Sequence, residues 1–299
     1  MDKLRIGTIL YANDAVKIIP QIIQHGFECF SIEFGNTEGV DMAETAKQLN
    51  EALSGKDAII SCLSNYGNPL EKGNDSEETV ATWKRMIDNA HLFGTDLVTG
   101  FAGRLRDRSI IDSIPRFKEV FGELSKRAVG KGVRLAFENC SCNGNWKSGD
   151  WNIAHCPAAW EMMFDAVPSD NIGLEWEPCH QMIKLIDPIQ QLRKWVGKVF
   201  HIHGKDASIA WDIIKEFGID GPKKFAWDRI PGFGDCNWAD IITILHQGGY
   251  KGVVDIEGWH DPMFRGELEM TGQVRALNYL KQCRGGDFVP NPVSEYKNY

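Results

Sequence analysis

Short apolar runs rich in β-branched and aromatic residues recur along the whole chain and predict eight buried strands. The predicted strands are residues 4–9, 29–34, 57–63, 96–101, 133–138, 171–177, 198–203 and 252–257. In the segments between them, apolar residues recur at helical spacing, as Val16, Ile19 and Ile23 do in the first one. The predicted helices are residues 15–25, 42–53, 76–93, 110–130, 157–167, 188–195, 238–247 and 267–283.

Eight almost continuously apolar strands that alternate with eight helices are typical of an α/β fold of the TIM barrel, or (β/α)8, type. A doubly wound open sheet is the alternative, and it favours a glycine-rich phosphate-binding turn after the first strand. Residues 10–13 form that turn and contain no GxGxxG motif. We therefore predict a single-domain barrel over residues 1–283. Residues 284–299 are expected to form a C-terminal tail that straps the barrel or contacts another subunit.

Composition narrows the class of protein. The chain has 299 residues, of which 43% are hydrophobic, so it can bury one large core. Its formal net charge of −8 argues against a nucleic-acid binder that neutralises phosphates. No apolar run has transmembrane length, and the N-terminus lacks the apolar region of a signal peptide. The eight cysteines are scattered without a CxxC motif, which is typical of reduced thiols in a cytoplasmic enzyme.

Acidic and imidazole side chains stand where the last four predicted strands end. These four residues, one from each strand, are Glu138, Glu177, His203 and Glu257. Pro178 ends the sixth strand because proline has no donor for the strand ladder, and His180 follows in the next loop. Glu175 shares a strand face with Glu177, and two carboxylates on one face need a positive partner such as a metal ion.

In a TIM barrel these strand ends converge on the active site. Three carboxylates and one imidazole suit Mn²⁺, Mg²⁺ or Co²⁺ better than a structural zinc ion. The alternative for each residue taken alone is a salt bridge at the rim, with Lys205, Arg229 or Arg265 as partner. For the set of four we predict one bound divalent ion. Three carboxylates overcompensate its charge, so one of them can also act as a base.

The motifs at these strand ends resemble those of the xylose isomerase-like TIM-barrel sugar isomerase/epimerase superfamily. They are Glu138-Asn139, ExxH from Glu177, HxHxKD from His201, PGFGD from Pro231 and DIEGW from Asp255. The resemblance implies that Glu138, Glu177, His203 and Glu257 hold a divalent metal, usually manganese. It also implies that Glu138 and Glu257 move a substrate proton from opposite faces and that His180 contacts a sugar oxygen. The superfamily usually has aspartate where this chain has Glu177, so the metal is expected to shift by about a methylene.

The chemistry expected of such a site begins with the metal, which polarises a sugar carbonyl as a Lewis acid. A carboxylate then removes the proton from the neighbouring carbon and leaves an enediolate. Return of the proton to the other face gives epimerisation, and return to the adjacent carbon gives isomerisation. Loss of a β-substituent gives elimination instead.

Further residues near the strand ends are candidates for holding the substrate. They are Glu33, Trp176, His180, Lys205 and Arg229. Tryptophans gather in the same region and suggest aromatic platforms for a sugar ring or an aglycone. These are Trp146, Trp151, Trp176, Trp211, Trp227 and Trp259. The long loops 139–156 and 204–237 are predicted lids.

The first functional hypothesis is a metal-dependent sugar isomerase or epimerase, and the second is a lyase or hydratase on 3-oxo-sugars or 3-oxo-glycosides, including C-glycoside cleavage by elimination. An abasic-site endonuclease would need more histidine ligands and a basic rim. A non-catalytic barrel would not need four ligands. We expect a small carbohydrate substrate, no nucleic-acid or membrane partner, and a homo-oligomer, with or without a partner subunit.

Overall fold

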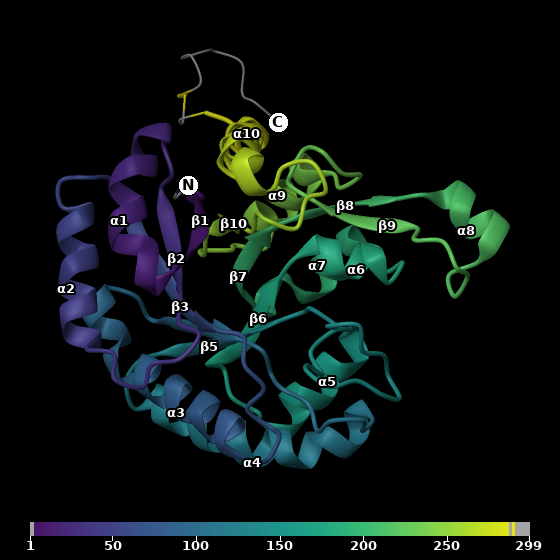
Figure 1. The fold of residues 1–299 in the computed structure, drawn as a ribbon, viewed down its shortest axis with the longest axis horizontal. Helices are drawn as coiled ribbons and strands as arrows, with labels where there is room; N and C mark the ends of the chain where they lie inside the picture. The colour runs from purple at the N-terminus through teal and green to yellow at the C-terminus, as the bar shows by residue number, and fades with distance from the viewer. Residues whose placement is uncertain (1–2, 287–288, 291–299) are drawn as a thin grey trace, which may run out of the picture.

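The computed structural model describes residues 3–286 and 289–290. Eight parallel strands close into a barrel in the order β1-β10-β7-β6-β5-β4-β3-β2 (Figure 1). Their bounds are β1 Ile6–Tyr11, β2 Cys29–Glu33, β3 Ile59–Asn65, β4 Leu97–Gly100, β5 Arg134–Glu138, β6 Ile172–Trp176, β7 Val199–Gly204 and β10 Val254–Ile256. The prediction of a single-domain TIM barrel is confirmed.

Eight helices that were predicted from periodicity surround the barrel. They are α1 Ala12–Ile22, α2 Met42–Leu53, α3 Asn74–Asn89, α4 Ile110–Val129, α5 Pro157–Ala166, α7 Pro188–Trp195, α9 Trp238–Gln247 and α10 Glu269–Arg284. The bounds of α2, α7 and α9 agree with prediction because a side chain caps each N-terminus. Asp41, Asp187 and Asn237 accept hydrogen bonds from backbone N–H groups of the first turn. Within the described residues, no helix combines the length and apolarity needed to span a bilayer.

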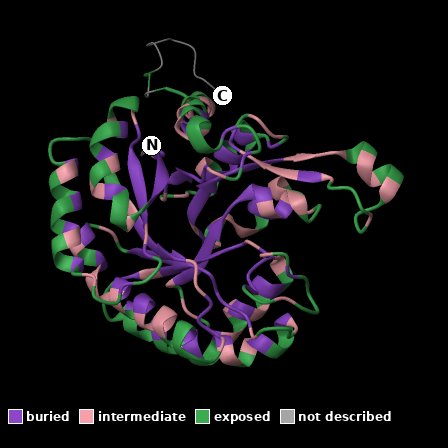
Figure 2. Ribbon diagram, in the orientation of Figure 1, coloured by how far each residue is buried: buried purple, intermediate pink, exposed green. Residues whose placement is uncertain are grey.

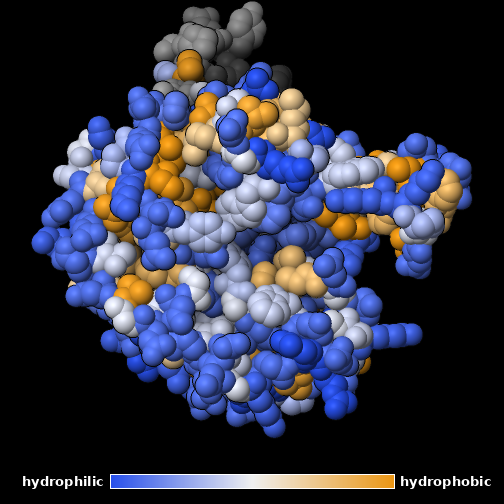
Figure 3. All heavy atoms as spheres, in the orientation of Figure 1, coloured by the Kyte–Doolittle hydropathy of each residue, from blue (hydrophilic) through white to orange (hydrophobic). Residues whose placement is uncertain are grey.

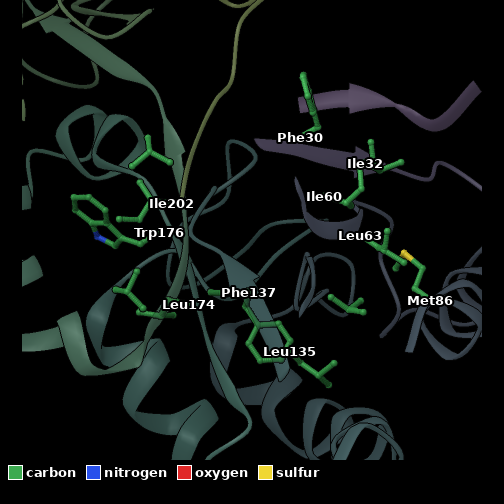
Figure 4. Packing of buried hydrophobic residues seen from close by; sticks show 14 of the residues in the cluster. Phe30, Ile32, Ile60, Leu63, Met86, Leu135, Phe137, Leu174, Trp176 and Ile202 are labelled. Carbon is green, nitrogen blue, oxygen red and sulfur yellow. The ribbon is translucent and has the colours of Figure 1, made fainter. Parts of the chain in front are cut away.

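The main hydrophobic core lies between the strands and the surrounding helices. Figure 2 shows the strands as buried, whereas the helices expose their outer faces. Aromatic rings fill part of this layer, and the Phe121 and Phe137 ring centroids are 4.7 Å apart in an edge-on arrangement. Residues Leu135, Leu174 and Ile202 belong to the same core from neighbouring strands (Figure 4). Close packing of this kind holds the strand ends, and therefore the site, in fixed positions.

The predicted loop 204–237 contains secondary structure that was not predicted from its sequence. It forms a two-stranded hairpin, β8 Asp206–Ile209 and β9 Ala226–Arg229, with helix α8 Trp211–Phe217 between the strands. This arm projects from the barrel in Figure 1, and apolar side chains gather near its tip in Figure 3. Trp211 at the start of α8 and Ile219 just after it are both exposed. The two strands, DASI and AWDR, mix polar and apolar residues and lack the continuous apolar run of the barrel strands, which is why the region reads as a loop.

The C-terminal helix is fastened to the end of the barrel opposite the carboxyl ends of the strands. Arg284 Nη1 donates to the carbonyl oxygen of Leu4 at 2.8 Å and lies 2.6 Å from Glu28 Oε2. Glu28 also accepts from the Ile6 N–H at 3.1 Å and lies 2.8 Å from Lys3 Nζ. The buried carboxylate of Glu28 therefore links the residues at the start of β1 to the end of α10. Most of the predicted tail of residues 284–299 lies outside the described residues.

We expect the Glu28→Gln variant to lose about 1–3 kcal/mol of unfolding free energy at pH 7, because a charge-assisted network loses its acceptor. Burial raises the pKa of Glu28, but Arg284 and Lys3 outweigh it and lower the pKa to about 2. A lowered native pKa means that the stabilisation is complete above the unfolded pKa of about 4.3 and is lost as the pH falls. The difference between variant and wild type should therefore shrink from pH 4.3 towards pH 2.

Urea denaturation at several pH values measures this difference. Glu161→Gln is the matched control, because the Glu161–Lys194 pair is exposed and such pairs contribute little. A difference that stays the same down to pH 2 would contradict the assignment of the stabilisation to ionised Glu28.

Candidate functional site

The four predicted metal ligands lie together at the carboxyl ends of four adjacent strands. Glu138 is the last residue of β5, Glu177 follows β6 directly, His203 lies in β7, and Glu257 follows β10 directly. Each offers a ligand atom, all of these atoms lie within 4.8 Å of one another, and all four residues are buried. His203 Nδ1 is 3.6 Å from Glu138 Oε1 and 3.4 Å from Glu257 Oε2.

Several polar atoms in this cluster are buried without a hydrogen bond. They are both carboxylate oxygens of Glu177, Nδ1 of His203 and Oε2 of Glu257, judged against the described part of the chain. Each unpaired buried polar atom costs about 1–3 kcal/mol. Convergent oxygen and nitrogen atoms with excess negative charge are the donor set that a hard divalent cation takes. The residues present therefore fit such a cation.

Lys205 sets the orientation and charge of Glu257. Its Nζ lies 2.9 Å from Glu257 Oε1, so the other oxygen, Oε2, stays unpaired and faces His203. Burial raises the pKa of the Glu257 carboxyl, but the Lys205 ammonium outweighs it and holds the pKa well below its usual range. For Glu138, burial raises the pKa more than the neighbouring His203 lowers it, so the pKa of this carboxyl is raised. The two carboxylates therefore sit in different electrostatic environments.

His180 lies on a short helix, α6 Pro178–Ile183, rather than in a loop as predicted. Pro178 ends the strand as expected, but its fixed φ also suits the first helical position, so the chain turns into a helix. His180 Nε2 is 2.5 Å from Glu177 Oε1, without the geometry of a hydrogen bond, and 3.8 Å from Glu138 Oε1. Burial and the nearby Lys205 hold the pKa of His180 well below its usual range, so the ring is neutral at pH 7.

A cavity of about 540 Å³ opens beside the cluster. Of the residues predicted to hold substrate, Glu33, His180 and Lys205 line it together with Glu138, His203 and Glu257. Burial, with Glu257 and Glu138 adding, raises the pKa of Glu33 to about 7, so it is partly protonated near neutrality.

Sequence reasoning missed several residues that line the same cavity. Tyr11, Tyr66, Phe101, Lys184, Lys224 and Asp228 are among them. Tyr66 and Phe101 follow strands β3 and β4, so the strand-end rule that found the acidic residues could also have found them. Asp228 and Lys224 come from the arm, whose hairpin the sequence does not reveal.

Two predicted substrate-binding residues do not line the cavity. Trp176 is fully buried behind β6, where its Nε1 donates to Gln191 Oε1 at 2.7 Å. It lies between two inward-facing residues of the strand, and alternate side chains point to opposite faces. Arg229 donates to Asp261 Oδ2 at 2.9 Å and holds the base of the arm. Of the predicted aromatic platforms, Trp259 lines the cavity, whereas Trp151 lines a separate surface groove.

The matches to known sequences differ in extent. The family profile described as "Xylose isomerase-like TIM barrel" matches residues 19–283. An inosose dehydratase of Clostridium perfringens is 27% identical over 128 residues, which cover 41% of this chain and 41% of that protein. The matched segment thus spans about two fifths of the relative.

Solved structures share the barrel over nearly the whole chain. A xylose isomerase domain protein from Planctomyces limnophilus has a TM-score of 0.73 at 17% identity, covering 95% of this chain and 98% of that one. The 3-keto-D-glucoside 4-epimerase of E. coli has a TM-score of 0.69 at 15% identity, covering 94% of this chain and 100% of that one. At these identities the likeness concerns the fold.

Proposed function

This chain belongs to the xylose isomerase-like TIM barrel family, and from that premise we propose that it is a divalent-metal-dependent sugar isomerase or epimerase. It would move a proton on the carbon beside a carbonyl group of a small carbohydrate. The observation that carries the proposal is the convergence of unpaired, buried donor atoms from Glu177, His203 and Glu257 beside a cavity of ligand size.

The four ligands Glu138, Glu177, His203 and Glu257 would hold the cation, with Mn²⁺ as the first candidate and Mg²⁺ or Co²⁺ as alternatives. When bound, the cation supplies Lewis acidity towards substrate oxygens. Lys205 keeps one oxygen of Glu257 occupied, which fixes the direction of the other. This arrangement gives the carboxylate one defined orientation before any substrate enters.

Proton transfer falls to Glu138 and Glu257. The strands that carry them, β5 and β10, are separated in the barrel by β6 and β7, so the two carboxylates approach the cavity from different sides. One can remove a proton from one face of a flat intermediate and the other can return a proton to the opposite face. His180, Lys205 and Glu33 line the cavity as donors and acceptors for sugar oxygens.

A dehydratase or other lyase is the second candidate, which the inosose dehydratase relative favours. Elimination begins with the same removal of a proton beside a carbonyl and then needs an acid for the leaving oxygen. Glu33 is suited to that role, because its pKa of about 7 keeps it partly protonated at neutral pH. The two candidate reactions therefore differ in the fate of a β-substituent and share the base.

Incubation in D₂O separates the two candidates. Ketoses, inososes and 3-oxo-glycosides would each be treated with enzyme and Mn²⁺, and the products followed by NMR and mass spectrometry. An isomerase or epimerase should place deuterium on carbon beside the carbonyl and keep the carbon skeleton and substituents. A lyase should release water or an aglycone. Turnover of a substrate without any exchange of its α-proton would contradict proton abstraction.

A further inference from the structure

Directly behind the four ligands, Glu175 forms a buried carboxylate that the proposed proton transfer does not use. It lies in β6 and is fully buried, as is His201 in β7. Its Oε1 is 3.1 Å from His203 Nε2 and 2.8 Å from His201 Nδ1. Its Oε2 accepts a hydrogen bond from Tyr66 Oη at 3.2 Å. The positive partners that the sequence demanded for Glu175 are therefore histidines.

These contacts decide which nitrogen of His203 faces the cavity. His203 Nε2 faces Glu175 and also lies 3.2 Å from Tyr66 Oη. Tyr66 gives its one hydrogen to Glu175 Oε2, and an ionised carboxylate can only accept, so Nε2 must carry the hydrogen. The other nitrogen, Nδ1, is the unpaired atom that points towards Glu138 and Glu257. The ring could turn over if nothing held it, and Nδ1 would then leave the cluster.

His201 in turn holds Glu175. Its Nδ1 faces Glu175 Oε1 and its Nε2 lies 2.8 Å from Asp255 Oδ2, so both ring nitrogens meet a carboxylate. Asp255 also accepts from Ser61 Oγ at 2.5 Å. These side chains form a continuous chain of polar contacts inside the barrel. The chain runs from Ser61 in β3 through Asp255, His201 and Glu175 to His203 in β7, and each member has a defined partner.

We propose that Glu175 is a positioning residue for the metal site, which holds the His203 imidazole with Nε2–H towards β6 and Nδ1 towards the cavity. The His201–Asp255 pair holds the Glu175 carboxylate in this position. This inference rests on the proposed metal site. Carboxylates that hold the free nitrogen of a metal-binding histidine generally raise metal affinity 10- to 100-fold.

Titration of Mn²⁺ into the purified metal-free protein, followed by electron paramagnetic resonance, tests the proposal without any substrate. Glu175→Met removes the acceptor and keeps the length of the side chain, so the dissociation constant should rise about 10- to 100-fold. Glu175→Gln keeps an acceptor oxygen for both histidines and turns an NH₂ group towards Tyr66 Oη, which then accepts instead of donating. Its affinity should therefore stay within about 3-fold of wild type, well inside that outer-shell range. Glu28→Met is the matched control, because it removes a buried carboxylate at the far end of the barrel and should leave Mn²⁺ affinity unchanged.

Two results would overturn the positioning role. One is wild-type affinity in Glu175→Met, and the other is an equal loss in Glu175→Gln, which would assign the effect to charge alone. A wild-type protein that binds no Mn²⁺, Mg²⁺ or Co²⁺ would instead refute the proposed function. In that case a crystal structure of the metal-free Glu175→Met variant decides the inference. A His203 ring whose Nδ1 still faces Glu257 would overturn the positioning role.

Discussion

With saturating Mn²⁺, the Glu138→Gln and Glu257→Gln variants are expected to turn over the substrate about 10²- to 10⁴-fold more slowly than wild type. Glutamine keeps the volume of each side chain and one acceptor oxygen, but its amide cannot take a proton from carbon. Initial rates and deuterium incorporation, measured on the substrate found by the D₂O screen, report this loss. Both the forward reaction and the exchange should fall in each variant.

The same two variants also lose a charged ligand, so the metal content of each must be measured beside its rate. A large loss of rate at full metal occupancy assigns proton transfer to the carboxylate. Glu161→Gln serves as the control, because Glu161 is exposed on α5 and pairs with Lys194 far from the cavity. Turnover and exchange that survive both substitutions would contradict the mechanism.

The second large effect concerns the metal. Removal of the imidazole in His203→Ala should weaken Mn²⁺ binding by more than the 10- to 100-fold that loss of an outer-shell partner typically costs. Glu177→Gln should do the same, because a neutral amide is a poor ligand for a hard cation. Glu177→Asp keeps the charge and shortens the side chain by one methylene, so the protein should retain metal.

Elemental analysis of protein purified without chelator, together with Mn²⁺ titration, measures these effects. His91→Ala is the control, since His91 is exposed beside α3 and away from the cluster. Equal metal content in wild type and His203→Ala would exclude His203 as a ligand. Full activity in Glu177→Gln would exclude Glu177 in the same way.

The barrel was predictable because its strands are apolar, its helices have one apolar face, and the two kinds of element alternate strictly along the chain. Strands such as β5 and β6 are buried on both faces, so they read as continuous apolar runs. Side chains at the starts of α2, α7 and α9 fixed their bounds locally. The hairpin of the arm was not predictable, because β8 (DASI) and β9 (AWDR) mix polar and apolar residues and pair across an intervening helix.

The convergence of the four candidate metal ligands was predictable for a related reason. A TIM barrel brings the carboxyl ends of its strands to one place, so Glu138, Glu177, His203 and Glu257 could be grouped from sequence position alone. The substrate-binding set was harder to predict. Whether a residue beside a strand end faces the axis or the helices depends on the local pleat and on where the strand stops. Trp176 was misplaced for that reason, whereas Arg229 lies in the hairpin of the arm, which the sequence did not reveal.

The sequence by itself determined the family, the barrel and the convergence of the four candidate ligands, because each depends on local periodicity and on the order of motifs along the chain. The tertiary structure decided which nitrogen of His203 faces the cavity, that Glu175 meets two histidines, and that Asp228 of the arm joins the site. Those features depend on atoms from strands far apart in sequence that approach within hydrogen-bond distance. Such distances are set by packing of the whole barrel, and no local pattern of residues encodes them.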